Sequence, residues 1–339
     1  MMEEQNNEEQ QSGKSESQPF ESRLDLSELH DGVNRIREAL SGVLVGQQHQ
    51  VDLLLSALLA NGHVLIEGVP GLAKTLMARA LAAAVGVKFS RIQFTPDLMP
   101  TDVTGTSMFN PKTQDFQYHK GPVFSNFVLI DEINRAPAKT QAALFEVMEE
   151  RTVTAAGKTY KMDEPFFVMA TQNPIEHEGT YRLPEAQIDR FMYKLELSYP
   201  SLEDEVGILG AHHHKPAYSA LQDMKPVVDG DFIRRSRALV QKVHVEAPLL
   251  TYIATLVGKT RNHKFISLGA SPRASLALLN GAKSMAALQG RDFITPEDVQ
   301  SVLIPALRHR MMLSAEAEME GKRPDGMLKS LINSVEVPR

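Results

Sequence analysis

Hydrophobic and polar positions follow two different periods along the chain, and the change between them divides it into parts. From Leu24 apolar positions recur at helical spacing, and from residue 63 short apolar runs alternate with amphipathic helical stretches. Beyond about residue 199 the strand pattern stops and helical periods remain. Residues 1–24 are rich in Glu, Gln, Asn and Ser, so we expect a disordered, acidic and polar tail. An α/β core over residues 25–199 and a smaller helical domain over residues 200–339 are predicted.

The predicted strands are nearly continuous apolar runs, which is typical of strands covered on both faces in a parallel sheet. They are His63–Glu67, Phe89–Phe94, Phe127–Asp131, Phe166–Ala170 and Tyr193–Leu197. The predicted helices are Gln47–Leu59, Lys74–Ala84, Lys139–Glu150, Pro184–Phe191, Asp231–Val243, Leu249–Asn262, Pro272–Leu288, Pro296–Arg308 and Gly326–Ser334. This alternation predicts a doubly wound α/β fold, followed by an all-α part.

Composition narrows the class of protein. The 339 residues are 42% hydrophobic and 23% charged, which suits a globular protein of about two domains. The chain has no cysteine, which excludes disulfides, thiol catalysis and cysteine-ligated metals. Its net charge of −6 argues against a general nucleic-acid-binding surface. Because no long apolar run or signal-peptide pattern is present, we expect a cytoplasmic protein without membrane insertion.

The segment after the first predicted strand almost matches the phosphate-binding pattern G-x-x-x-x-G-K-[ST], with Ala73 in place of the second glycine. Such a loop directs backbone N–H groups and a helix N-terminus at a polyphosphate. Lys74 would reach the β- and γ-phosphates, and the Thr75 hydroxyl would bind Mg²⁺. The expected nucleotide-binding residues here are Gly68, Val69, Pro70, Gly71, Leu72, Ala73, Lys74, Thr75 and Leu76.

The apolar strand that begins at Phe127 ends in two acids, Asp131 and Glu132, at the same predicted edge of the sheet. Asp131 would support Mg²⁺ together with Thr75, and Glu132 would position and polarise the attacking water. An exposed acidic turn after a buried strand is the alternative interpretation. Asn173, after the next strand, would bond the γ-phosphate or the water, although Asn-Pro also initiates ordinary turns.

Two arginines are further candidates. Arg190 would stabilise transition-state charge at a neighbouring subunit's nucleotide, unless it only forms a surface ion pair within its own chain. Arg273 lies in the first turn of a predicted helix, where a cation opposes the helix dipole. If the helical domain folds over the nucleotide, Arg273 would contact the γ-phosphate.

These motifs, in this order from about Val45 to Leu303, make the chain resemble a MoxR-type AAA+ ATPase. Gly68–Thr75 resembles the MoxR form of Walker A, so Ala73 is a family trait. Leu129–Ala136, with Lys139, Gln141 and Leu144–Glu150, resembles Walker B and its following helix. Ala170–Pro174 resembles sensor 1, Gly179–Phe191 the arginine-finger segment (with Arg182 in place of the usual proline) and Ser271–Arg273 sensor 2. Val45, Gly46 and Gln47 resemble the adenine-side box.

The resemblance implies an AAA+ P-loop core with a helical lid, ATP or ADP and Mg²⁺ as cofactors, and a homo-oligomeric, hexameric ring. It implies a chaperone-like role in remodelling or maturing protein complexes, with a client such as a von Willebrand factor A domain protein. Residues 95–123 resemble the helix-2 insert facing the ring's pore, and residues 150–162 resemble the hairpin before sensor 1. Either insert is alternatively a packed surface hairpin without substrate contact.

Other functions of the same clade remain open. A nucleic-acid motor disagrees with the net charge and with the lack of a DNA-reading module after the helical domain. A chelatase-type motor subunit would be revealed only by its partner. A nucleotide-binding module without hydrolysis is the fourth alternative.

Overall fold

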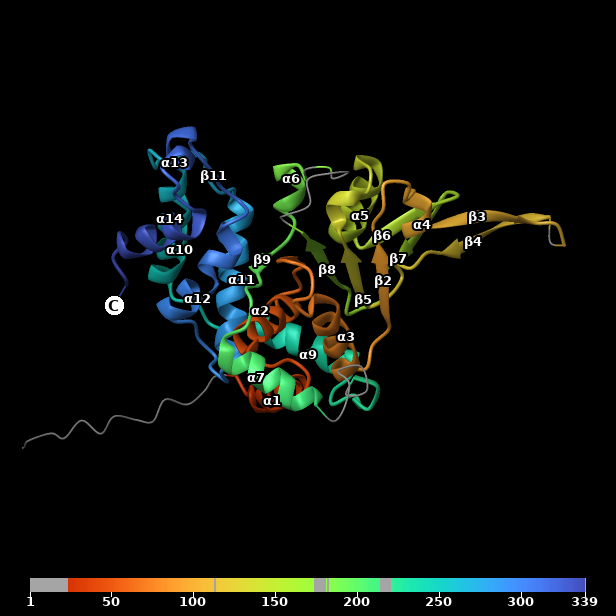
Figure 1. Ribbon diagram of the computed structural model, residues 1–339, viewed down its shortest axis with the longest axis horizontal. Helices are drawn as coiled ribbons and strands as arrows, with labels where there is room; N and C mark the ends of the chain where they lie inside the picture. The colour runs from red at the N-terminus through yellow and green to blue at the C-terminus, as the bar shows by residue number, and fades with distance from the viewer. Residues whose placement is uncertain (1–23, 113, 174–180, 182, 214–220, 339) are drawn as a thin grey trace, which may run out of the picture.

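A five-stranded parallel sheet forms the centre of the molecule in the computed structural model, which describes residues 24–112, 114–173, 181, 183–213 and 221–338 (Figure 1). Its strand order is β2 (Phe89–Gln93), β5 (Phe127–Asp131), β8 (Phe167–Gln172), β1 (Val64–Glu67) and β9 (Tyr193–Glu196). Every neighbouring pair is parallel. The predicted tail, residues 174–180 of the sensor 1 and arginine-finger segments, and Arg182 lie outside or largely outside the described residues.

Alternate side chains of each strand enter two separate cores, because successive residues of a strand point to opposite faces. Phe127 and Leu129 of β5 pack in the core that contains the first three helices, whereas Val128 and Ile130 pack with Leu144 on the other face. The core helices are α1 (Ser27–Ser41), α2 (Gln48–Leu59), α3 (Lys74–Val85), α4 (Pro100–Thr104), η1 (Ile133–Arg135), α5 (Ala138–Glu150) and α6 (Glu185–Ile188). Helices on both faces define the predicted doubly wound fold.

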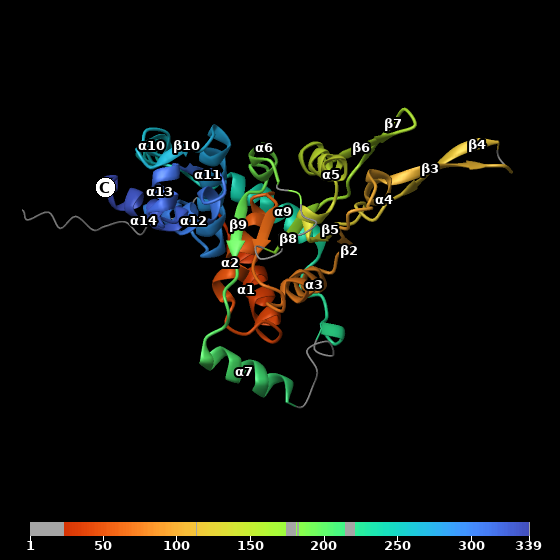
Figure 2. The same cartoon turned by 45° about the horizontal axis from the view of Figure 1, so that its top comes forward.

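Two antiparallel hairpins project from the same side of the core (Figures 1 and 2). The first pairs β3 (Gly105–Asn110) with β4 (Asp115–Lys120), and the second pairs β6 (Thr152–Ala155) with β7 (Lys158–Lys161). Gly105 permits the sharp entry into β3, since its φ is +109° and a Cβ there would lie 2.2 Å from the carbonyl oxygen of His119.

The C-terminal part is helical apart from one small sheet. Its helices are α7 (Leu202–His212), α9 (Gly230–Gln241), α10 (Ala247–Arg261), α11 (Pro272–Leu288), α12 (Pro296–Leu307), α13 (Ala315–Met319) and α14 (Pro324–Asn333). The antiparallel pair β10 (Ile266–Leu268) and β11 (Met312–Leu313) was not predicted. Strands of three and two residues are too short to show an alternating pattern in the sequence.

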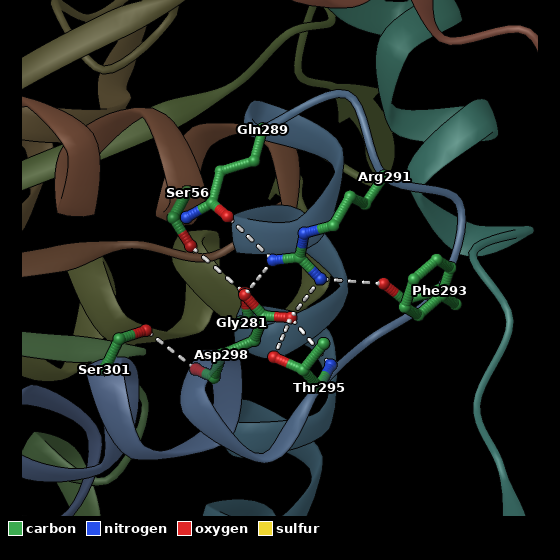
Figure 3. A network of polar contacts seen from close by, with 8 residues as sticks. All are labelled: Ser56, Gly281, Gln289, Arg291, Phe293, Thr295, Asp298 and Ser301. Carbon is green, nitrogen blue, oxygen red and sulfur yellow. Dashed lines mark hydrogen bonds and ion pairs between the residues drawn. The ribbon is translucent and has the colours of Figure 1, made fainter.

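The connection between α11 and α12 is fixed by one arginine–carboxylate pair (Figure 3). The two terminal nitrogens of Arg291 donate to the two oxygens of Asp298 at 2.9 and 2.6 Å. Asp298 also accepts the backbone N–H of Thr295 at 2.8 Å, which caps α12. Gly281, within α11, lies close to β9: a Cβ built there would be 2.2 Å from the Tyr193 hydroxyl. The close approach of Gly281 to Tyr193 attaches the helical part to the sheet.

Most predicted elements agree with the structure to within one or two residues. The largest difference is the helix predicted for Pro184–Phe191, which forms only over Glu185–Ile188. The backbone carbonyls of Asp189 and Phe191 bond instead to the distant Arg310. None of the helices in the described ranges is long and apolar enough to cross a membrane.

Candidate nucleotide-hydrolysis site

The phosphate-binding loop connects β1 to α3, and two of its residues have left-handed backbone angles. Gly71 has φ +89° and Ala73 has φ +56°. Nothing lies within 4 Å of a Cβ built at Gly71, so its backbone angle rather than space favours glycine there. Ala73 adopts the angle that suits the glycine of the general motif, at a cost of about 1 kcal/mol. The loop therefore has the motif's shape despite the alanine.

Lys74 and Thr75 begin α3, so both lie at a helix N-terminus, where N–H groups favour an anion. The Lys74 ammonium donates a hydrogen bond to the carbonyl of Gly68 at 2.7 Å. Gly68 itself is packed against the end of β9, because a Cβ there would lie 3.0 Å from the carbonyl oxygen of Leu197. The loop is thus anchored at its first residue and closed by its lysine.

The two predicted acids lie where β5 ends and are both held by polar contacts. Asp131 is buried, and its carboxylate accepts from Arg91 Nε at 2.5 Å and from the Thr171 hydroxyl at 3.1 Å. Glu132 has φ +57°, and its backbone N–H donates to the same threonine at 3.0 Å. Thr171 therefore links the two acids to β8.

The Glu132 carboxylate accepts two hydrogen bonds at one oxygen. Gln93 Nε2 donates to Oε2 at 2.6 Å, and an Arg135 terminal nitrogen donates to Oε2 at 2.9 Å. No individual role was predicted for Gln93, Arg135, Arg91 or Thr171. Thr171 and Arg135 lie within the predicted sensor 1 and Walker B segments, and Gln93 is a polar residue near the end of a predicted strand, whereas Arg91 carried no signal.

Asn173 follows β8 directly and is buried. Since β8 lies between β5 and β1, Asn173 lies between the two acids and the phosphate-binding loop. Strands β1 and β5 are two positions apart, about 10 Å in a sheet. The loop, Asp131, Glu132 and Asn173 thus share one edge of the sheet, as predicted from the sequence.

The segment Val45, Gly46 and Gln47 lies beside α7. Gly46 has φ +72°, and a Cβ there would lie 2.4 Å from the carboxyl carbon of Asp204. A Cβ on Gly207 would lie 3.2 Å from Val45. The Gln47 side-chain oxygen is buried and has no hydrogen-bond partner in the described chain. A buried acceptor without a partner is consistent with the adenine-side position that the resemblance implies for this segment.

Arg190 and Arg273 meet at one carboxylate at the opposite edge of the sheet. Arg190 Nε lies 2.8 Å from Glu149 Oε2, and Arg273 pairs with Oε1 of the same residue. They line a pocket of about 260 Å³ with residues that precede β1 and β9. Because these strands are parallel, the pocket lies where they begin and the phosphate-binding loop where β1 ends. The structure brings the two arginines together, but not to their own chain's loop.

A third arginine, Arg310, holds the segment that carries Arg190 and was not predicted. Its buried guanidinium donates to the carboxylate of Asp189 at 2.7 Å. It also donates to four carbonyls, those of Asp189 (2.9 Å), Phe191 (2.7 Å), Met192 (2.9 Å) and Ala306 (2.6 Å). The Asp189 carboxylate also accepts from Ser271 at 3.0 Å, two residues before Arg273. Both arginine-bearing segments are therefore joined.

The same pocket is lined by His63, a buried histidine that remains neutral. Its Nδ1 accepts the backbone N–H of Val168 at 3.0 Å, so its Nε2 donates to the carbonyl of Met148 at 3.1 Å. Burial, with the nearby cation Arg151, lowers the pKa of His63 to about 3. His63 therefore links β1, β8 and α5 and has no role as a base.

The donor set suits a magnesium nucleotide. Mg²⁺ takes oxygen ligands, commonly one or two carboxylates together with phosphate oxygens and waters. Thr75 and Asp131 supply such oxygens at the sheet edge. Within the described ranges no three His, Asp or Glu side chains are grouped so that they could hold a metal ion.

The parallel sheet has this strand order, a phosphate-binding loop and two acids at one edge, and a helical part that follows it along the chain. These features define an AAA+ type of P-loop protein. The model of the ATPase family associated with various cellular activities (AAA) matches residues 63–193, and that of the AAA lid domain matches residues 258–331. Chaperone MoxR1 of Mycobacterium tuberculosis is 44% identical, over 88% of this chain and 80% of its own length.

Two other relatives agree. Uncharacterized protein YeaC of Bacillus subtilis is 46% identical over 92% of this chain and 96% of its own. A crystal structure of a "putative ATPase" from Cytophaga hutchinsonii superposes with a TM-score of 0.84, at 40% identity, covering 91% of this chain and 96% of that one. The chain belongs to the MoxR family of AAA+ ATPases.

Proposed function

We propose that the protein hydrolyses ATP with Mg²⁺ in a hexameric ring and uses the energy to remodel protein complexes in the cytoplasm. The observation that carries the hydrolysis is the arrangement at one sheet edge. At the ends of β1, β5 and β8 lie a phosphate-binding loop with the shape of the motif and the side chains of Thr75, Asp131, Glu132 and Asn173. Mg²⁺, when bound, would neutralise phosphate charge.

Each residue has a task that its position allows. The Lys74 ammonium, which donates to the Gly68 carbonyl in this structure, would bind phosphate oxygens when a nucleotide is present. Asp131 keeps its charge oriented through Thr171 and Arg91. Glu132 orients water with its carboxylate. For this, at least one of the hydrogen bonds that Gln93 and Arg135 donate to Oε2 must break. Asn173 contacts the transferred phosphate or the water.

Arg190 and Arg273 would serve the nucleotide of a neighbouring copy. Strand β1 has four residues, about 13 Å, and separates these arginines from their own loop. Their shared ion pairs with Glu149 are about one third to one half exposed, so they are weak and exchangeable. A head-to-tail contact that brings this face to the next loop repeats around a ring. For Arg273, contact with a neighbouring copy's nucleotide replaces the contact with the γ-phosphate of its own chain that the sequence predicted.

Helix α7 supports the contact between copies. Figure 2 shows α7 standing apart from the other helices of the core. Its residues Leu202, Val206 and Leu209 recur at helical spacing and are 61–79% exposed. Its first turn carries three acids, and residues 201–211 have no lysine or arginine. This apolar and acidic surface, beside Val45 and Gly46, complements the face that carries Arg190 and Arg273, where Leu276 is exposed. We assign a second copy of this chain as its occupant.

The remodelling role rests on similarity: a relative covering most of this chain is named a chaperone. The two hairpins are the parts best placed to transmit a change of domain angle to a client, a protein that would carry a von Willebrand factor A domain. The chain's net charge of −6 makes a nucleic-acid partner unfavourable.

The substitution Glu132→Gln tests hydrolysis. It should keep ATP affinity within about twofold and lower turnover by at least about 100-fold, because the carboxylate that polarises water is lost. Glu150→Gln, on the exposed end of α5, is the matched control and should keep full turnover. Normal turnover by the Glu132 variant would contradict the role of this residue. Stimulation of turnover by DNA, lost at higher salt, would contradict a protein client.

Mixed rings test the arginines. Arg190→Ala should abolish turnover alone, and mixing it with Glu132→Gln subunits should restore part, since some interfaces then hold an intact arginine beside an intact glutamate. The absence of any recovery would argue against action on a neighbouring copy. Serine at Leu202, Val206 and Leu209 should abolish assembly in sedimentation, whereas serine at the exposed Met319 should not.

A further inference from the structure

The two hairpins present sides that face each other. Tyr118 of β4 stacks on Tyr160 of β7, with ring centroids 4.7 Å apart and planes at 27°. Because side chains alternate along a strand, residues two positions apart share a face with these tyrosines. The facing sides are Ser107, Phe109, Phe116, Tyr118 and Lys120 on the first hairpin, and Ala155, Lys158 and Tyr160 on the second.

Aromatic contacts tie the hairpin bases together. Phe124, just after the first hairpin, packs edge-on against Tyr118 and Tyr160 with centroids at 6.1 and 6.5 Å. Such pairs contribute about 0.5–1.5 kcal/mol each beyond burial. The two hairpins, about 40 residues apart in sequence, are therefore expected to move as one unit.

The outer part of the first hairpin exposes its aromatic residues. Phe109 and Phe116 are cross-strand partners with ring centroids 5.4 Å apart, and they are 55% and 64% exposed. In this two-stranded sheet they have no core to enter. Exposed, adjacent aromatic side chains on a projecting element indicate a contact surface.

The charge of the facing sides is positive, against the sign of the whole chain. Lys120 and Lys158 lie on them, and Lys112 and Lys161 are exposed nearby. The one acidic residue within 105–120 and 152–161 is Asp115, which pairs with Asn110 and so belongs to the other face. A partner there should be acidic.

Both hairpins also have unpaired strand edges. The sheets β3–β4 and β6–β7 contain two strands each within the described residues, so the outer edge of each strand offers backbone N–H and C=O groups. An extended polypeptide adds to such an edge as a further strand, with side-chain contacts supplying specificity. A nucleic acid cannot form that ladder, which favours polypeptide over nucleic acid.

We propose that the facing sides of the two hairpins bind an extended, acidic polypeptide segment with aromatic or large aliphatic residues, and that this segment belongs to the client. The client's backbone pairs with a hairpin edge, its apolar side chains contact Phe109 and Phe116, and its carboxylates pair with Lys120 and Lys158. This inference rests on the proposed function only in identifying the segment as part of the client.

Fluorescence anisotropy on the full chain tests it with a labelled peptide in which glutamate alternates with phenylalanine and valine. Phe109→Ala with Phe116→Ala should weaken binding about tenfold or more, the loss of roughly two aromatic contacts. Lys120→Glu with Lys158→Glu should weaken it similarly. The controls are Met319→Ala and Lys329→Glu, exposed residues of the helical part, which should leave binding unchanged.

Three further probes separate the alternatives. A peptide with lysine in place of glutamate, and one N-methylated at alternate backbone nitrogens, should each bind at least about tenfold more weakly. Tighter, salt-sensitive binding of an oligothymidylate strand would overturn the proposal in favour of nucleic acid. Unchanged peptide binding with altered sedimentation of the phenylalanine variant would assign the surface to a second copy. Since peptide binding needs no turnover, failure of the ATPase proposal is recognised separately.

Discussion

Replacing Arg310 by methionine tests how the two distant arginines are positioned. Arg310 is 3% exposed at its side chain and donates five hydrogen bonds to the segment from Asp189 to Met192 and to Ala306. Burial lowers its pKa, and Asp189 opposes that shift, so the guanidinium remains charged. Methionine fills similar space along the stem and removes the charge and every donor.

The expected loss of stability follows from what is left behind. Removing one partner of a buried ion pair costs about 3–5 kcal/mol, because the remaining groups stay buried without partners. An unfolding entropy of about 2.1 cal/mol/K per residue gives about 0.7 kcal/mol/K for the 339-residue chain. The Tm should therefore fall by about 4–7 °C.

Differential scanning calorimetry of the nucleotide-free protein measures this change. Arg323→Met is the matched control, because Arg323 is 80% exposed and lies 3.9 Å from Glu196, so its Tm should change by less than about 1 °C. At a temperature where both variants are folded, Arg310→Met should also lower turnover at saturating ATP, since Arg190 loses its support. Its ATP affinity should stay unchanged because the loop lies at the other edge.

Two results would refute this reasoning. Equal Tm values for the Arg310 and Arg323 variants would show that the five hydrogen bonds do not hold the segment. A lowered Tm with normal turnover at the lower temperature would show that Arg310 stabilises the fold without positioning Arg190.

Three further predictions concern other sites. Ala73→Gly should keep ATP affinity in calorimetric titrations, whereas Ala73→Val should weaken it, because a branched residue at φ +56° adds about 1–3 kcal/mol of strain; equal affinities would contradict this. The pKa of His63 is about 3 in the folded state and about 6.5 unfolded, so its stabilising effect is complete above pH 6.5 and declines below it. In urea unfolding, the wild type should lose about 2 kcal/mol more than His63→Asn between pH 7 and pH 5. Glu149→Gln should lower the Tm by less than about 1.5 °C, since its ion pairs are partly exposed, and a fall as large as that of Arg310→Met would disprove their weakness.

Local chemistry made much of the site predictable. A polyphosphate needs consecutive backbone N–H groups, a lysine and a hydroxyl within a few residues, so Gly68–Thr75 is visible in the sequence. The acids Asp131 and Glu132 and the amide Asn173 were predictable because parallel strands end at a common edge. The strands themselves were predictable because a sheet covered on both faces needs continuous apolar runs.

The residues that hold these groups were not predictable in the same way. Arg91, Gln93 and Thr171 contact the acids across about 40 positions, and no local period constrains such pairs. Helix α6 ends early because the carbonyls of Asp189 and Phe191 accept hydrogen bonds from Arg310, which is about 120 residues away in the sequence. Short strands such as β11 form only because a partner is brought beside them.

The sequence alone therefore determined the fold class, the phosphate-binding loop and the carboxylates, since each depends on neighbouring residues or on strand periodicity. Only the tertiary structure decided that Arg190 and Arg273 share Glu149 at the edge opposite the loop, and that Tyr118 and Tyr160 join the two hairpins. Both facts follow from packing between segments far apart in the chain. Which arginine meets which phosphate, and which surface meets a client, depend on such long-range packing.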